Sequence, residues 1–450
     1  MSLRFGTDGI RGVANVELTP ELAFDVGRAG ATVLAAQSDV AKPIVVGRDT
    51  RLSGSMLEAA LVAGITSTGR DTLSVGIVPT PGVARITALI DAAAGVMISA
   101  SHNPIEDNGI KFFGPDGYKL TDEQERAVEA ALDDARSLPR ATHAEVGIVR
   151  TAHGLVDRYF ATLVEGGTDL SRLTVVVDAA FGAAYLVGPR ALARLGATVE
   201  PLHARDDGSR INVRCGSTDL STLAARVVAL AAERPSAHVL GVAFDGDADR
   251  ALFVDENGAT VDGDAIMLVL AREKKLRGTL ARDTVVGTVM SNVGLERALR
   301  EEGIALVRAG VGDRYVLEHM RAGGFTFGGE QSGHIIDLTR NTTGDGPGTA
   351  VALFSLVARE RTTLAELARA LRVAPQILVN VRTTDKTVLR SQRVVAAIAA
   401  VERELGTDGR ILVRSSGTEP LVRVMIEGDD RDRIERLANG VADIVREAAH

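Results

Sequence analysis

Short apolar runs, rich in β-branched residues, alternate along most of the chain with glycine-containing turns and with Ala/Leu/Arg-rich stretches of helical period. The pattern is clearest at residues 43–65 ("PIVVGRDTRLSGSMLEAALVAGI"), 173–196 ("LTVVVDAAFGAAYLVGPRALARLG") and 283–303 ("DTVVGTVMSNVGLERALREEG"). Each stretch predicts a buried strand, a turn and a helix. The alternation favours an α/β fold in which helices cover mixed, largely parallel sheets. The spacing suggests a weak internal repeat, although independent occurrences of a common unit would look the same.

The pattern changes near residue 373. The segments "ILVNVRTTD" and "GRILVRSSGTEPLVRVMIEGDD" alternate as strands do, and helical patterns follow at 387–405 and 430–449. These features predict a smaller C-terminal α+β domain, and a helix over 362–373 would close the part before it. We therefore expect three related α/β domains and a small fourth one, with boundaries at 1–152, 153–252, 253–372 and 373–450.

Length and charge narrow the class of protein. A chain of 450 residues exceeds what one core usually holds, so several domains are expected. The net charge of −8, from 51 basic and 59 acidic residues, argues against a nucleic-acid partner. Cys215 is the only cysteine, which excludes an intrachain disulfide and fits a reducing compartment. With no apolar leader at the start and no bilayer-length apolar run, we predict a cytoplasmic protein without a membrane partner.

The stretch "ISASHNPIEDNGIKFFG" at 98–114 contains the first candidate for chemistry, Ser101, beside His102 and ten residues before Lys111. Ser and Asn-Pro are turn formers, so an ordinary turn is the simpler interpretation. A nucleophilic serine is the alternative, and the choice depends on what the other loops supply.

The stretch "LGVAFDGDADRALFVDENG" at 240–258 contains three alternating carboxylates, Asp245, Asp247 and Asp249. In an extended segment they point to one side, where they would repel each other unless a cation or cationic side chains lie between them. Hard oxygen ligands suit Mg²⁺ or Ca²⁺. A calcium-binding helical loop is excluded because Arg250 occupies the position of its turn glycine and the flanks read as strands. A Mg²⁺ loop is preferred to a plain polar turn.

Two further glycine-rich loops carry polar side chains. "FGGEQSGHIID" at 327–337 offers a carboxylate and a hydroxyl suited to sugar hydroxyls, and "VRSSGTEPLVRV" at 413–424 offers backbone donors, hydroxyls and two arginines suited to a phosphate. Each is weak alone, because polar turns and hairpins with surface arginines are common. "FGTDGIRG" at 5–12 adds Arg11.

Some familiar catalytic motifs are absent. The chain has no Gly-Lys dipeptide, hence no P-loop, and no G-x-S-x-G elbow surrounds Ser101. A serine, a metal loop, a sugar loop and a basic cradle together fit phosphoryl transfer to a sugar phosphate, which depends on positioning and charge neutralisation. Without a nucleotide site, a phosphorylated serine is the expected donor.

The motifs "SASHNP", "DGDADR", "GEQSGH" and "RSSGTEP" resemble, in order, the four signature loops of the α-D-phosphohexomutases, and the resemblance covers essentially the whole chain. The segments at 211–220 ("INVRCGSTDL") and 309–320 ("AGVGDRYVLEHM"), together with Gln331, are most similar to the phosphoglucosamine mutase branch. Phe181, where asparagine is common, is a departure outside the four loops.

The resemblance implies four domains around a central cleft and one Mg²⁺ per chain. Ser101 would carry the phosphoryl group, with Mg²⁺ on Asp245, Asp247, Asp249 and an oxygen of that phosphoserine. Lys111, Arg11 and His102 are candidates for acid/base work. The implied substrate-binding residues are Arg250, Gly329, Glu330, Ser332, Arg414, Ser416, Gly417, Thr418 and Arg423.

The implied reaction interconverts glucosamine 6-phosphate and glucosamine 1-phosphate through glucosamine 1,6-bisphosphate, and feeds UDP-N-acetylglucosamine and cell-wall precursor synthesis. A homodimer is possible. Three alternatives stay open: a phosphoglucomutase/phosphomannomutase, a Mg²⁺-dependent sugar phosphatase, and a binding protein that senses sugar phosphates.

Overall fold

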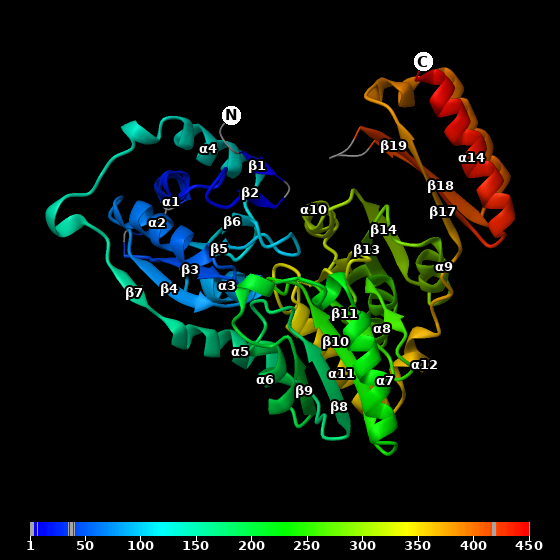
Figure 1. Ribbon diagram of the computed structural model, residues 1–450, viewed down its shortest axis with the longest axis horizontal. Helices are drawn as coiled ribbons and strands as arrows, with labels where there is room; N and C mark the ends of the chain where they lie inside the picture. Colours follow the sequence, from blue (N-terminus) through cyan, green and yellow to red (C-terminus); the bar gives the residue numbers. More distant parts are fainter. Residues whose placement is uncertain are drawn as a thin grey trace. The chain divides into compact units, whose positions relative to one another are not determined.

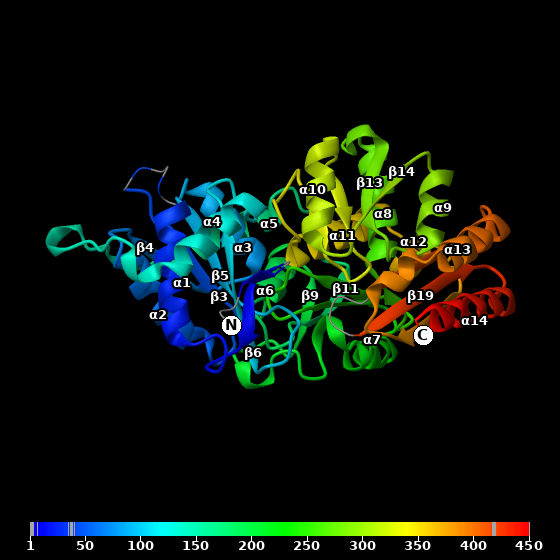
Figure 2. The ribbon, with the colours of Figure 1, turned by 90° about the horizontal axis from the view of Figure 1, so that it is seen from above.

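The computed structural model describes residues 4–6, 8–34, 36, 39, 41–415 and 420–449. The chain divides into two compact units. The first unit comprises residues 1–288 and 307–368, and the second comprises 289–306 and 369–450 (Figures 1 and 2).

The first unit begins with a mixed seven-stranded sheet of order β1-β2-β6-β5-β3-β4-β7. Its strands are β1 (Phe5–Gly6), β2 (Gly9–Val13), β3 (Ile44–Arg48), β4 (Thr72–Ile77), β5 (Ala94–Ile98), β6 (Asp107–Phe113) and β7 (Val149–Thr151). Strand β3 runs parallel to β4 and β5, whereas β6 is antiparallel to β5 and β2. The helices here are α1 (Pro20–Leu34), α2 (Gly54–Thr66), α3 (Thr80–Leu89) and α4 (Asp122–Asp133).

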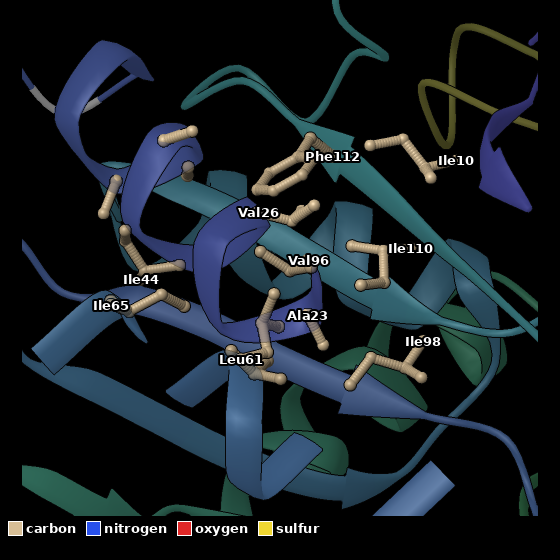
Figure 3. Close-up of a cluster of buried hydrophobic side chains, with 14 of the residues drawn as sticks. Ile10, Ala23, Val26, Ile44, Leu61, Ile65, Val96, Ile98, Ile110 and Phe112 are labelled. Carbon is tan, nitrogen blue, oxygen red and sulfur yellow. The ribbon is translucent and has the colours of Figure 1, made fainter. Parts of the chain in front are cut away.

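The core of this layer follows from the two-residue period of its strands. Alternate side chains such as Ile44 and Val96 face the helices α1 and α2, which contribute Val26 and Leu61 to the same cluster (Figure 3). The intervening positions face α3. Gly95 lies so close to that helix that a Cβ atom there would come within 2.2 Å of the Thr87 hydroxyl. Helices on both faces bury the central strands, as the sequence predicts.

Two more sheets complete the first unit. One has the order β12-β11-β10-β8-β9 and the other β14-β13-β15-β16. Their strands are β8 (Leu173–Asp178), β9 (Thr198–Leu202), β10 (His238–Phe244), β11 (Ala251–Val254), β12 (Thr260–Val261), β13 (Thr284–Thr288), β14 (Ala305–Ala309), β15 (Phe327–Gly329) and β16 (Ile335–Asp337), where β14 belongs to this unit from residue 307. The helices are α5 (Val156–Val164), α6 (Val187–Arg194), α7 (Ser221–Glu233), α8 (Gly263–Leu276), α10 (Asp313–Gly323), α11 (Gly346–Glu360) and α12 (Leu364–Ala368). Helix α12 is shorter than the predicted 362–373, and the boundary of the unit falls at its last residue, Ala368.

The second unit is a small α+β layer. Strands β17 (Gln376–Arg382), β19 (Leu421–Gly428) and β18 (Gly409–Ser415) form an antiparallel sheet in that order. Helices α9 (Val293–Glu301), α13 (Gln392–Leu405) and α14 (Arg431–Ala448) accompany it, and α14 contacts β17 and β19 (Figure 1). The predicted helices at 387–405 and 430–449 are present, although the first begins later, after the 3₁₀ helix η7 (Lys386–Arg390).

Short 3₁₀ helices elsewhere are η1 (Ala135–Ser137), η2 (His143–Glu145), η3 (His153–Leu155), η4 (Gly208–Arg210), η5 (Gly216–Thr218) and η6 (Ala281–Asp283).

In the part of the chain that the structure describes, no helix combines the length and the apolar character needed to cross a membrane.

Candidate active site

The three aspartates lie in a tight turn between two antiparallel strands. Strand β10 ends at Phe244 and β11 begins at Ala251. The expectation of an extended segment is wrong. The backbone N–H of Ala248 donates to the carbonyl of Asp245 at 3.1 Å, and Ala248 has a φ of 56°. The turn brings one carboxylate oxygen of each aspartate within 4.8 Å of the others.

This carboxylate cluster has the chemistry of a cation site. All three aspartates are buried, and Oδ1 of Asp247 and of Asp249 has no hydrogen-bond partner among the described residues. Burial raises the pKa of Asp245 well above its usual value, and the neighbouring Asp249 and Asp247 raise it further. Buried oxygens without donors are the environment that a hard divalent cation stabilises, so the residues fit a metal ion.

Ser101 joins this cluster from another sheet. It follows β5 in the loop that leads to β6, and its hydroxyl donates to Oδ2 of Asp245 at 2.7 Å. His102 Nδ1 lies 3.4 Å from the same hydroxyl. Ser101 is buried and has a φ of 53°, a backbone region that residues other than glycine rarely occupy. A non-glycine residue held there at a polar site is characteristic of functional loops.

Lys111 neutralises part of the acidic cluster. Its ammonium lies 2.8 Å from Asp8 and from Asp247, and 3.8 Å from Asp249. Burial alone would lower the pKa of Lys111, but Asp247, Asp8 and Asp249 outweigh burial and raise the pKa above its ordinary value. Lys111 is therefore a fixed positive charge in this arrangement.

The remaining cationic candidates surround Ser101. Arg11, on β2, pairs with Asp8 and points a second nitrogen at the amide oxygen of Asn103, 3.4 Å away. Burial, together with the charges of Arg250 and Arg11, lowers the pKa of His102 to about 4, so its imidazole is neutral near pH 7. Arg250 donates its backbone N–H to Oδ1 of Asp245 at 3.2 Å.

The loop predicted to hold sugar hydroxyls connects β15 to β16, directly after Gly329. The Glu330 carboxylate accepts the backbone N–H of Gly312 at 3.0 Å, and the Ser332 hydroxyl is buried without a hydrogen-bond partner in the described chain. Gly333 has a φ of 90°, and a Cβ atom there would come within 2.2 Å of the Ala251 carbonyl. Glycine is required at 333 because the loop abuts the strand that follows the aspartates.

Gln331 is one of the residues that resemble the phosphoglucosamine mutase branch. Its side chain contacts the residue that caps helix α8. Its side-chain amide donates to Oδ2 of Asp262 at 3.2 Å, and Asp262 caps the start of α8. Gln331 therefore fixes the loop against a helix.

Four ionisable residues outside the predicted catalytic and binding set complete the site: Asp8, Lys119, Asp313 and His334. The Lys119 ammonium lies 2.6 Å from Asp8 and also pairs with Asp313. His334 Nε2 lies 3.6 Å from Asp313 and 3.7 Å from Asp249. Asp8, Asp313 and His334 lie in segments that the sequence marked, at 5–12, 309–320 and 327–337, although no role was predicted for them. Lys119 had no such signal.

Two of the predicted basic residues lie in the second unit. Arg414 on β18 and Arg423 on β19 are opposite each other in the sheet register. Burial and the charge of Arg423 both lower the pKa of Arg414. Ser416, Gly417 and Thr418 lie outside the described residues.

Comparison with known families assigns every part of this architecture. Residues 2–138, 157–258 and 262–373 match the α/β/α domains I, II and III of phosphoglucomutase/phosphomannomutase, and residues 378–444 match its C-terminal domain. The chain belongs to the phosphoglucomutase/phosphomannomutase family. It is an enzyme of the mutase type that acts on a sugar phosphate.

Individual relatives agree over the full length. The chain is 53% identical over 451 residues to the phosphoglucosamine mutase of Desulforamulus reducens, with 99% of each chain covered. It is 54% identical to the phosphoglucosamine mutase of Pelotomaculum thermopropionicum, covering 99% of this chain and all of that one. A crystal structure of a phosphoglucomutase/phosphomannomutase family protein from Burkholderia thailandensis aligns with a TM-score of 0.82 at 26% identity, over 98% of this chain and 97% of that chain.

Proposed function

We propose that this family member is a phosphoglucosamine mutase, which interconverts glucosamine 6-phosphate and glucosamine 1-phosphate. Full-length relatives of that name at 53% and 54% identity support the choice of substrate. The observation that carries the chemistry is the 2.7 Å hydrogen bond between Ser101 and Asp245, because it joins a candidate phosphoryl carrier to a candidate metal ligand.

Ser101 is the residue that we propose to be phosphorylated in the resting enzyme. A phosphoserine carries about −1.5 to −2 charges near neutral pH, which cannot sit beside three buried carboxylates without a cation. Asp245, Asp247 and Asp249 would hold one Mg²⁺ together with an oxygen of the phosphoserine. The ion would neutralise oxygen charge during transfer.

Catalysis would then proceed in two balanced transfers. In the first, the 1-hydroxyl of glucosamine 6-phosphate attacks the phosphorus of phosphoserine. A bond forms between phosphorus and the oxygen on C1, the P–O bond to Ser101 breaks, the 1-hydroxyl proton passes to a base, and the Ser101 oxygen takes up a proton. The resulting 1,6-bisphosphate turns within the site. In the second transfer, the Ser101 hydroxyl gives its proton to a base and attacks the 6-phosphoryl group. The P–O bond to Ser101 forms, the P–O bond to the sugar's 6-oxygen breaks, that oxygen takes up a proton, and glucosamine 1-phosphate departs.

The cationic residues near Ser101 would share the charge and proton handling. Lys111, held between carboxylates, is suited to electrostatic stabilisation. His102, whose pKa is lowered to about 4, is a weak base near pH 7 and would either share the proton transfer or order the loop. Arg11 and Arg250 would neutralise phosphate oxygens. Glu330 and Ser332, beside Gly329, would bind sugar hydroxyls.

The second unit would bind the phosphate that is not being transferred. Arg414 and Arg423 place two guanidinium groups opposite each other on one sheet, and guanidinium groups match phosphate in shape and charge. Ser416, Gly417 and Thr418 would complete this cradle. The four domain boundaries, the central cleft, the cytoplasmic location and the homodimer stay predictions from the sequence.

A coupled assay with glucosamine 6-phosphate, with and without glucosamine 1,6-bisphosphate, tests the proposal. We expect glucosamine 1-phosphate to accumulate and the bisphosphate to stimulate the rate by restoring phosphoserine. Release of inorganic phosphate in place of the isomer would indicate a phosphatase. Binding of ligand with no turnover would favour a sensing protein.

A further inference from the structure

Ser101 lies in a loop whose backbone is held by hydrogen bonds from a side chain outside the loop. Arg51 follows β3 at the turn into α2, and its side chain is fully buried. Its guanidinium donates to the backbone carbonyls of Ser101 at 3.0 Å and Asn103 at 2.8 Å. It also donates to the carbonyl of Asp107 at 3.0 Å and to that of Pro104. One planar group thus fixes three carbonyls of the loop and the carbonyl of the first residue of β6.

A second chain of hydrogen bonds reaches the other side of Ser101. Nε of Arg51 donates to Asp49 at 3.1 Å, and the hydroxyl of Ser99 donates to the same carboxylate oxygen at 2.6 Å. The Ser99 oxygen in turn accepts the backbone N–H of Ser101 at 2.9 Å. Both the N–H and the carbonyl of Ser101 are therefore tied to Arg51, directly or through two buried side chains.

Asn212, in the turn that follows η4, also holds this loop. Its side-chain amide donates to the carbonyl of Ser101 at 2.8 Å and to that of Asn103 at 3.2 Å. These are two of the carbonyls that Arg51 also binds. The backbone of Asn212 is fixed by a bond from its N–H to the Ala180 carbonyl at 3.1 Å.

The turn that carries Arg51 contacts both the segment before Asn212 and the loop after β8 to which Asn212 bonds. The Thr50 hydroxyl donates to the carbonyl of Phe181, and a Cβ atom on Gly208 would come within 1.8 Å of the Thr50 carbonyl. The absence of a side chain at 208 lets the two backbones meet. The backbone segments that carry Arg51 and Asn212 therefore pack against each other, and both side chains bond to the loop of Ser101.

We infer that Arg51 and Asn212 are positioning residues that hold Ser101 in its left-handed backbone conformation and aim its hydroxyl at Asp245. This inference rests on the proposed function. Neither side chain bonds the hydroxyl; both act through backbone carbonyls. Without these bonds the unfavourable φ of 53° would relax, because only surrounding contacts maintain such a conformation. A displacement of roughly 1 Å at a reacting atom costs about 10²-fold in rate.

Two conservative variants test the inference. Arg51→Lys keeps the charge but loses the planar fork, and Asn212→Asp keeps the shape but cannot donate to the carbonyls. For each we expect kcat to fall about 10²-fold while KM changes by less than about threefold, because substrate contacts are untouched. Incubation with glucose 1,6-bisphosphate should also leave less phosphate on Ser101, measured by intact-protein mass spectrometry.

Arg28→Lys is the matched control. Arg28 is as buried as Arg51 and also donates to backbone carbonyls, those of Ala135 and Leu138, each at 2.6 Å. Its replacement should lower the melting temperature but leave kcat and Ser101 phosphorylation of the folded protein unchanged. If Asn212→Asp does not fold, Asn212→Ala removes the donors without adding a charge and is measured in the same way.

The inference is overturned if Arg51→Lys and the Asn212 variant keep the kcat and phosphorylation of the unmodified protein, or lose them only to the extent that Arg28→Lys does. Failure of the proposed function looks different. The unmodified protein would then not turn over glucosamine phosphates, and Ser101 phosphorylation by glucose 1,6-bisphosphate would still decide the role of Arg51 and Asn212.

Discussion

The hydroxyl of Ser101 donates a 2.7 Å hydrogen bond to the carboxylate of Asp245, although the two residues come from different sheets and are 144 positions apart in the chain. The contact brings the loop after β5 and the turn after β10 to one point. A phosphoryl group on Ser101 would therefore meet the aspartate cluster directly, and both the phosphoserine and the metal can be tested separately.

Ser101 should be the residue that carries phosphate in the purified protein. Ser101→Ala should lose nearly all mutase activity with little change in the melting temperature, because the backbone bonds that hold the loop do not involve the hydroxyl. Peptide mass spectrometry and a circular dichroism melt check both parts. Phosphate found at another residue, or an active alanine variant, would refute the assignment.

Activity should require a divalent cation and disappear with EDTA. Asp247→Asn should lower the affinity for Mg²⁺ by about 10²-fold or more. Even substitutions of residues that only contact the metal ligands lower metal affinity by about 10- to 100-fold. The measurement is the dependence of kcat on Mg²⁺ concentration. Asp255→Asn is the control, because Asp255 lies in the turn after β11 and accepts the backbone N–H groups of Asn257 and Ala259. Equal Mg²⁺ dependence in the two variants would exclude Asp247 as a ligand.

Arg423→Ala should raise KM for sugar phosphates by about tenfold or more, because a hydrogen bond to a charged group is worth about 1.5–3 kcal/mol. Release of free bisphosphate should also increase. Arg393→Ala is suitable for comparison, since that arginine is exposed in the same unit and pairs with Glu447. A KM that does not change in Arg423→Ala would mean that the phosphate binds elsewhere.

Glucosamine phosphate should have the highest kcat/KM, glucose 1-phosphate a lower but measurable one, and mannose phosphate the lowest. Amine and hydroxyl at position 2 can both donate hydrogen bonds, so no buried partner is left unpaired, and the discrimination should stay far below about 10⁴-fold. Parallel assays on the three sugars decide this. A value for glucose or mannose that equals that for glucosamine would favour a phosphoglucomutase/phosphomannomutase.

Cys215 should resist thiol reagents in the folded protein. Burial and the nearby charge of Asp178 raise the pKa of this thiol to about 12. At pH 8 the thiolate fraction is then on the order of 10⁻⁴, and the thiolate is the reactive form. Reaction with a chromogenic disulfide should be slow in buffer, faster as the pH rises, and complete in guanidinium chloride. Rapid stoichiometric labelling at pH 8 would contradict the prediction.

The strand–turn–helix units were predictable because local period and glycine placement specify them. The identity of Asp245, Asp247 and Asp249 as a group was predictable from their spacing, but the reason given was wrong, since a tight turn gathers them. Lys119 and Asp313 could not be predicted, because an ion pair between residues 194 positions apart has no local signal. The same holds for Arg51 and Asn212, whose role appears only when their carbonyl partners are known.

The left-handed backbone at Ser101 also limits which amino acid can occupy the position. Threonine carries the same hydroxyl, but its second branch on Cβ makes a φ of 53° strongly unfavourable. In Ser101→Thr the loop would shift or the backbone would remain strained. In either case the hydroxyl would move out of hydrogen-bonding position to Asp245. The loop geometry therefore favours serine over threonine as the proposed phosphoryl carrier, because the main-chain conformation alone disfavours a β-branched residue there.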